Sequence, residues 1–97
     1  MILIRFVFQT KWGKAHEVVA AFKKSEEIMG EKYGRARILT DLSGPFHTVI
    51  QEIEVESLAE WEQNRAEIFS NPEFQKVQAG MVDVFESGRA EFYTIEA

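Results

Sequence analysis

Hydrophobic and polar residues along the chain follow two different periods, and the change from one period to the other predicts the order of the structural elements. Alternation of apolar and polar positions, which is typical of strands, occupies four segments: residues 2–10, 35–42, 46–55 and 90–96. Apolar residues recur every three or four positions over 13–30 and again over 57–88, which is typical of amphipathic helices. The predicted order is therefore strand, helix, strand, strand, helix, strand.

Local signals place the ends of these elements. Ser57 with Glu60 three residues later forms a capping box at the start of the second helical segment. Asn71 followed by Pro72 is a cap and first-turn pair, so the segment is expected to break there and restart as a further helix that ends by Gly88. The turn between the second and third strands is expected at residues 43–45 (Ser-Gly-Pro).

This order predicts the α+β class with a ferredoxin-like βαββαβ arrangement. An antiparallel four-stranded sheet would carry the helices on one face, with the second helix broken at Asn71-Pro72. A chain of 97 residues without repeats or linkers is expected to form one domain over residues 1–97.

Composition and charge exclude several classes of function. The chain has no cysteine, which excludes disulfides, thiolate metal sites and cysteine nucleophiles. A net charge of −5 argues against a nucleic-acid partner. No apolar run reaches the roughly 20 residues that span a bilayer, so we expect no membrane partner and a cytoplasmic location. His16 and His47 lack a paired carboxylate motif, and no glycine-rich phosphate loop is present, so we expect neither a metal nor a cofactor.

The sheet face without helices is expected to be apolar in either of two assignments. In one it carries Leu3, Val7, Val49, Ile53 and Val55. In the other it carries Ile2, Ile4, Phe6, Phe8 and Ile50. Because a monomer seldom exposes so large an apolar patch, we expect a second copy of the chain to cover this face, which makes the protein a homodimer.

Four polar strand residues are the candidate ligand-binding residues, namely His47, Gln51, Tyr93 and Arg5. His47 could carry a proton because its pKa in water is near neutrality, although a hydrogen-bonded structural histidine is the simpler interpretation. Arg5 needs either an anionic ligand or a carboxylate partner, for which Glu52 and Glu91 are candidates.

Each tryptophan is predicted to pack in the core or at its rim. Trp61 lies on the apolar stripe of its helix, which also contains Arg65.

The chain resembles NIPSNAP-like and antibiotic-biosynthesis-monooxygenase-like members of the dimeric α/β-barrel superfamily. The resemblance is carried by residues 54–62 (EVESLAEWE), 71–74 (NPEF) and 86–93 (ESGRAEFY). The Pro-Gly that usually follows the first strand is Trp12-Gly13 here. The resemblance implies a homodimeric α/β barrel with a cleft beside each sheet. It also implies, for some relatives, activity on aromatic or polyketide-like compounds without a cofactor.

Three functions remain open on these grounds. The first is a homodimer that binds a small, partly apolar organic molecule in a cleft lined by the four candidate residues. The second is a cofactor-independent monooxygenase or isomerase, in which His47 or Tyr93 moves a proton and Arg5 stabilises an enolate-like anion. The third is a structural or regulatory dimerisation module without a ligand.

Overall fold

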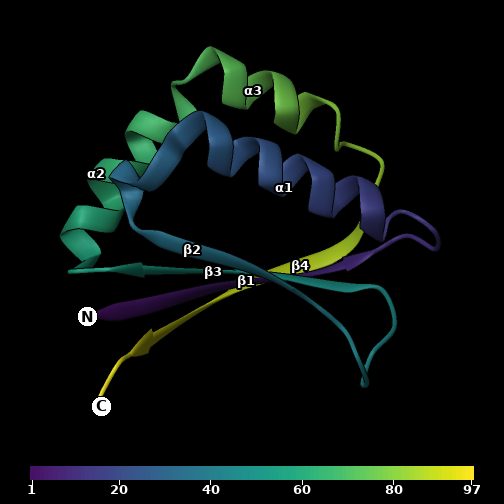
Figure 1. Ribbon diagram of the computed structural model, residues 1–97, viewed down its shortest axis with the longest axis horizontal. Coiled ribbons are helices and arrows are strands. Elements are labelled where there is room, and N and C mark those ends of the chain that lie inside the picture. The colour runs from purple at the N-terminus through teal and green to yellow at the C-terminus, as the bar shows by residue number, and fades with distance from the viewer.

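The computed structural model describes residues 1–97 and contains every predicted element in the predicted order. The bounds are β1 Ile2–Thr10, α1 Ala15–Met29, the 3-10 turn η1 Gly30–Tyr33, β2 Arg35–Thr40, β3 Thr48–Val55, α2 Leu58–Phe69, α3 Pro72–Ala79 and β4 Phe85–Thr94. The four strands form one antiparallel sheet in the order β2-β3-β1-β4, and the helices all lie over one of its faces (Figure 1). The ferredoxin-like fold is therefore confirmed. None of the helices combines the length and the hydropathy needed to cross a membrane.

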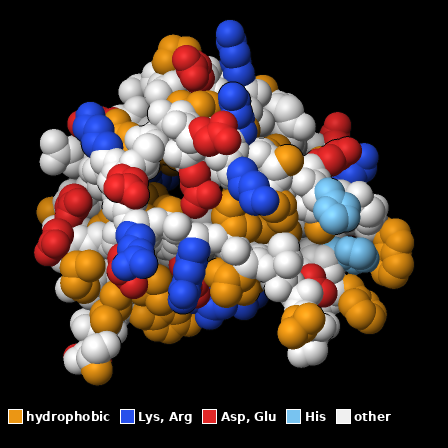
Figure 2. Space-filling model, in the orientation of Figure 1, with side chains coloured by type: hydrophobic (Ala, Val, Ile, Leu, Met, Phe, Trp, Pro, Cys, Tyr) orange, Lys and Arg blue, Asp and Glu red, His pale blue; other side chains and the backbone are white.

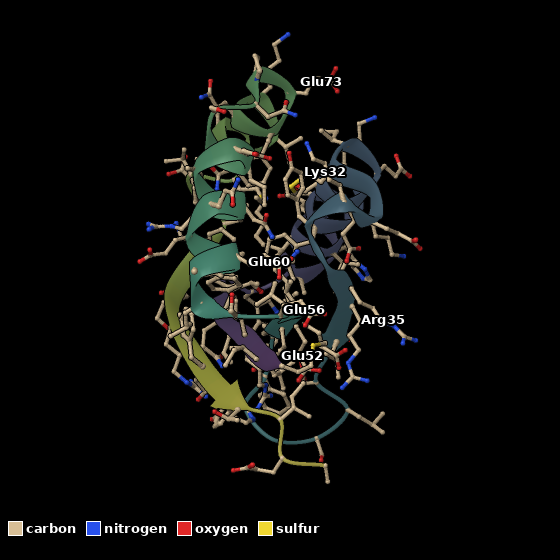
Figure 3. The ribbon with its side chains drawn as sticks, turned by 90° about the vertical axis from the view of Figure 1, so that its left-hand side faces the viewer. Lys32, Arg35, Glu52, Glu56, Glu60 and Glu73 are labelled. Atoms are coloured by element: carbon tan, nitrogen blue, oxygen red, sulfur yellow. The ribbon has the colours of Figure 1, made fainter.

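The predicted helix caps form as hydrogen bonds. The Glu60 backbone N–H donates to the Ser57 Oγ at 3.1 Å, and the Glu60 carboxylate accepts from the Glu56 N–H at 2.9 Å. Figure 3 shows Glu56 and Glu60 close together at this end of α2. The Asn71 Oδ1 accepts hydrogen bonds from the backbone N–H groups of residues 73 and 74, at 2.9 and 3.3 Å. This cap marks the start of α3 as a helix separate from α2. These contacts satisfy backbone donors that a helix start otherwise leaves free.

Several element boundaries differ from the prediction. α3 ends at Ala79, and β4 begins at Phe85, five residues before the expected start at Ala90. Phe85 pairs with Thr10 across a register shift in β1, so the early part of β4 is held by its partner strand, although its own sequence is mostly polar. β3 begins at Thr48, two residues after the expected Phe46.

A small apolar core holds α1 and the segment after α3 against the sheet. Val18, Phe22, Val49, Met81 and Val84 are buried and mutually packed. Alternate side chains of β1 point toward the helices, and side chains at helical spacing on α1 point back toward the sheet. Ile4 is completely buried on the same sheet face.

Strand pairing decides which residues share a sheet face, and neither of the two predicted assignments is right as a whole. Ile4 faces Ile53 and Phe8 faces Val49, so these β3 residues lie under the helices. Leu3, Val7 and Ile50 lie on the open face, which we define as the sheet face without helices. The open face also carries a row of charged side chains, so it is less apolar than either assignment predicts.

Candidate ligand-binding cavity

A cavity of about 430 Å³ lies between the sheet and the helical layer. Its floor comes from the helix-facing residues of β1, β3 and β4, and its walls come from α1, α2, α3 and the turn after α3. The lining residues are mostly apolar and are Phe6, Phe8, Phe22, Ser25, Met29, Gln51, Ile53, Trp61, Arg65, Ile68, Phe69, Phe74, Gln78, Met81, Ala90 and Phe92. A concave, mainly apolar space with a few polar groups is the usual form of a small-molecule site.

Aromatic rings in contact shape the cavity. The Phe6 ring on the floor lies 5.8 Å from the Trp61 ring on α2, measured between centroids. The Phe69 and Phe74 rings meet edge to face at 5.6 Å where α2 gives way to α3. Trp61, Arg65, Ile68 and Phe69 follow helical spacing, so one side of α2 supplies the wall. Rigid rings held by two different layers give the cavity a defined shape.

Four polar side chains line this apolar space: Ser25, Gln51, Arg65 and Gln78. The Ser25 Oγ already donates to the Ala21 carbonyl at 3.0 Å, which leaves its lone pairs free to accept. Gln51 lies half-buried in the floor of the cavity, and none of the chain's side-chain hydrogen bonds involves its amide. Its donor and acceptor groups are therefore free to bind a guest.

Arg65 is the one ionisable residue in the lining. Its guanidinium carbon lies 5.5 Å from the centroid of the Phe69 ring, a cation–π contact that holds the side chain against the wall. Sequence reasoning did not select Arg65 as a candidate. The feature of the sequence that could have indicated Arg65 is its place as a charged residue within the apolar stripe of a helix.

The structure does not bring the four predicted ligand-binding residues together. Gln51 lines the cavity, whereas Arg5 and Tyr93 lie on the open face, on the other side of the sheet. His47 lies outside the cavity, in the loop before β3 and not on a strand as expected. A shared role of all four in one site stays a prediction that this geometry does not favour.

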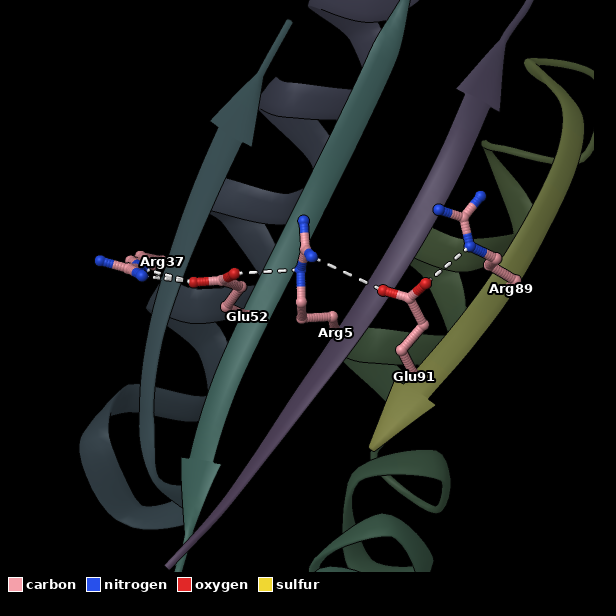
Figure 4. Close-up of polar contacts among 5 residues, drawn as sticks. All are labelled: Arg5, Arg37, Glu52, Arg89 and Glu91. Carbon is pink, nitrogen blue, oxygen red and sulfur yellow. Dashed lines mark hydrogen bonds and ion pairs between the residues drawn. The ribbon is translucent and has the colours of Figure 1, made fainter. Parts of the chain in front are cut away.

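Arg5 is the centre of an ion-pair row across the open face (Figure 4). Its Nε lies 3.1 Å from Glu52 Oε2, and its Nη1 lies 3.6 Å from Glu91 Oε1. Arg37 Nη2 closes one end on Glu52 at 2.6 Å, and Arg89 Nε closes the other end on Glu91 at 3.0 Å. The two carboxylates predicted as partners of Arg5 are both confirmed, and the row places alternating charges on all four strands.

The hydrogen bond from Arg89 holds the pKa of Glu91 below its ordinary value, and the charges of Arg89 and Arg5 act in the same direction. A lowered carboxyl pKa means that the native state favours the ionised form more than the unfolded chain does. This contribution to stability is present above the ordinary pKa of 4.5 and is lost as the pH falls through the lower native value.

His47 belongs to an exposed aromatic cluster at one end of the sheet. Its ring centroid lies 4.4 Å from that of Trp12, and its backbone adopts a φ of +59°, which is uncommon outside glycine. Trp12 is 81% exposed and Phe46 is 75% exposed, so the prediction that Trp12 packs in the core or rim is wrong. Trp12 lies in the turn after β1, where no other element covers it. Figure 2 shows histidine and hydrophobic side chains together at the right-hand end of the molecule.

No group of three or more histidine, aspartate or glutamate side chains is arranged to hold a metal ion.

Comparison with known proteins identifies the fold. No protein-family model matches the chain, and no curated protein matches its sequence. Among solved structures, an uncharacterized NIPSNAP domain protein from Burkholderia xenovorans superimposes with a TM-score of 0.87 at 18% identity, over 100% of this chain and 96% of that one. A NIPSNAP family protein with unknown function from Agrobacterium tumefaciens gives 0.85 at 16% identity, over 96% and 86%. A putative antibiotic biosynthesis monooxygenase from Nitrosomonas europaea gives 0.77 at 14% identity, over 100% of both chains.

Proposed function

We propose that this protein, which shares its fold with NIPSNAP and antibiotic-biosynthesis-monooxygenase-like proteins, binds a small, mainly aromatic organic molecule in the cavity and acts as a homodimer. The observation that carries the binding proposal is the cavity itself. It has a volume of about 430 Å³, and 12 of its 16 lining residues are hydrophobic. The space opens to solvent beside the partly exposed rings of Phe69 and Phe92, so a guest can enter it.

The polar groups of the cavity give the guest an orientation. The free amide of Gln51 lies in the floor, with Phe6 opposite it on β1. A carbonyl or hydroxyl group of the ligand would hydrogen-bond to this amide while its rings pack against Phe6 and Trp61. A free polar group in an apolar site favours guests that satisfy it over guests that leave it unpaired.

The same geometry favours binding over the two alternative functions. A monooxygenase or isomerase that uses His47 or Tyr93 as its proton carrier needs that side chain in the cavity, and neither lines it. Arg5, the candidate anion stabiliser, is paired with two carboxylates on the other sheet face. A purely structural module would not need the open space beside the sheet.

The homodimer proposal rests on the charge pattern of the open face. Its four arginines and three glutamates leave a charge of +1, although the chain as a whole carries −5. These residues are Arg5, Arg35, Arg37, Arg89, Glu52, Glu54 and Glu91. Two acidic subunits repel one another over most of their surfaces, but not over a nearly neutral face of alternating sign. Half-exposed Tyr93 and the partly exposed Leu39 add apolar area to the same face.

Tryptophan fluorescence tests the binding proposal directly because the chain has only two tryptophans. In a Trp12→Phe variant, all the tryptophan emission comes from Trp61 in the cavity wall. We expect the neutral bicyclic quinone 2-methyl-1,4-naphthoquinone to quench this emission saturably. The chain has no thiol that could add to the quinone.

Two variants serve as controls. In Trp61→Phe, the remaining emission comes from exposed Trp12, and quenching should rise without saturation. Ala90→Phe places a ring in the cavity floor and should abolish the saturable phase, whereas Ala20→Phe on the exposed side of α1 should not. Unsaturated quenching of Trp61 by the quinone, or saturable quenching that survives Ala90→Phe, would contradict binding in the cavity.

A further inference from the structure

The electrostatics of the cavity differ from those of the rest of the protein. The chain has 16 acidic residues, yet none of them lines the cavity. The single ionisable group in the lining is the cationic guanidinium of Arg65. A site with one positive charge and no negative charge, in a protein of net charge −5, attracts an anion locally while the protein as a whole repels anions.

Arg65 also differs from most other arginines in having no carboxylate partner. Arg5, Arg37 and Arg89 each form an ion pair on the open face. No carboxylate lies within the 4.0 Å ion-pair distance of the Arg65 guanidinium, and the neighbouring Glu67 is paired with Lys32 at 3.6 Å. The five N–H donors of Arg65 are therefore available to a ligand.

The position of Arg65 matches the proposed orientation of the guest. Arg65 lies one helical turn after Trp61 on α2, and both side chains line the cavity. Contact with the Phe69 ring limits the freedom of the guanidinium, so less conformational entropy is lost when it binds a ligand. A planar guanidinium fits a carboxylate through two parallel hydrogen bonds.

We propose that the ligand is an aromatic carboxylate, whose rings pack against the Trp61 and Phe6 side chains and whose carboxylate pairs with Arg65 at the exposed edge of the cavity. This inference rests on the proposed function, because it names the chemical class of the molecule that the cavity binds. It goes further by requiring that the negative charge itself be recognised.

A comparison of two matched probes tests the inference. 2-Naphthoate and 2-naphthamide have the same ring system and nearly the same shape, but only the first is an anion. We expect isothermal titration calorimetry of the full chain at low salt to show naphthoate binding about tenfold more tightly, which corresponds to one charge-assisted pair at a partly solvated site. The preference should narrow as salt is added, because Arg65 is exposed and its charge is screened.

Variants then assign the preference to Arg65. Arg65→Gln should abolish the difference between the probes while naphthamide binding stays within about twofold, and Arg65→Lys should retain part of it. Arg35→Gln is the matched control, since Arg35 is also unpaired but lies on the open face. It removes the same charge and should leave the preference unchanged.

The outcomes separate this inference from the proposed function. Equal affinity for the two probes would overturn the carboxylate assignment and leave binding in the cavity intact. Binding of neither probe would overturn the proposed function and the inference with it. An Arg65→Gln variant that weakens both probes equally would show a structural role and overturn the assignment. The comparison of the probes on the wild-type chain needs no variant to fold.

Discussion

At the scale of single residues, Glu52 shows how charge is accommodated in the middle of the sheet. Its side chain is 9% exposed and lies between Arg5 and Arg37, with contacts of 3.1 and 2.6 Å. Burial of a carboxylate is unfavourable unless hydrogen bonds and opposite charges compensate for the lost water. The two arginines provide that compensation, which makes each of the three side chains depend on the others.

We predict that Glu52→Ala lowers the free energy of unfolding by about 2 kcal/mol, because it leaves two arginines without their shared partner. Glu54→Ala is the matched control. Glu54 lies on the same strand and the same face but forms no ion pair, so its loss should have little effect. Urea unfolding followed by circular dichroism measures both. Equal effects of the two substitutions would contradict the stabilising role assigned to the row.

The residue pattern predicted the ion-pair partners of Arg5 better than it predicted which residues line the cavity. Arg5 in a central strand required carboxylates, and the two that strand register made available are its partners. Grouping Arg5 and Tyr93 with Gln51 did not anticipate the structure, because their side chains point to opposite faces of the sheet. Alternation shows which residues of one strand share a face, but not which face the helices cover.

At the scale of elements, the break between α2 and α3 shapes the cavity. The two helices meet at Asn71-Pro72, and both Phe69 before the break and Phe74 after it line the cavity. A straight helix through this region could not present both rings to the same space. The break was visible in the sequence because Asn and Pro each have a strong positional preference at helix starts.

We predict that Asn71→Ala lowers the free energy of unfolding by about 1 kcal/mol, because two backbone N–H groups lose the Oδ1 that accepts from them. Gln63→Ala on the exposed part of α2 is the control, and it should be neutral or slightly stabilising because alanine favours the helix interior. Thermal unfolding of both variants checks this. No loss of stability in Asn71→Ala would show that water replaces the cap.

Elements whose bounds depend on distant partners were predicted less well. The first part of β4 has few apolar residues and reads as a helix end and turn, yet it pairs with the end of β1. Alternation with apolar neighbours predicts a strand at His47, but its positive φ puts it in the loop before β3. Pairing across the sheet and backbone turns override local pattern at such places.

At the scale of the whole molecule, the two sheet faces have different roles in our proposals. The helix side holds the ligand, and the open face meets a second copy. Charge separates them: an alternating row covers the open face, whereas the helix side of the sheet presents apolar rings.

We predict a dimer in small-angle X-ray scattering and sedimentation at micromolar concentration. Tyr93→Glu on the open face should raise the dimer dissociation constant about tenfold or more, because it removes an apolar ring and buries a carboxylate beside Glu91, whose charge has the same sign. Val82→Glu adds the same charge at a position that is 76% exposed after α3, and it should leave the dimer intact. A monomeric wild-type chain, or equal effects of the two substitutions, would contradict association through this face.

The sequence by itself determined the order of the elements, the helix caps and the break at Asn71-Pro72, because each of these depends on residues close together along the chain. The order of the elements in turn indicated the ferredoxin-like fold. Only the tertiary structure decided which sheet face the helices cover, where the cavity lies and that Arg65 is its single charge. These features depend on how β1 pairs with the distant strands β3 and β4 and on which side of the sheet the helices pack. Hydrophobic period carries no information about either.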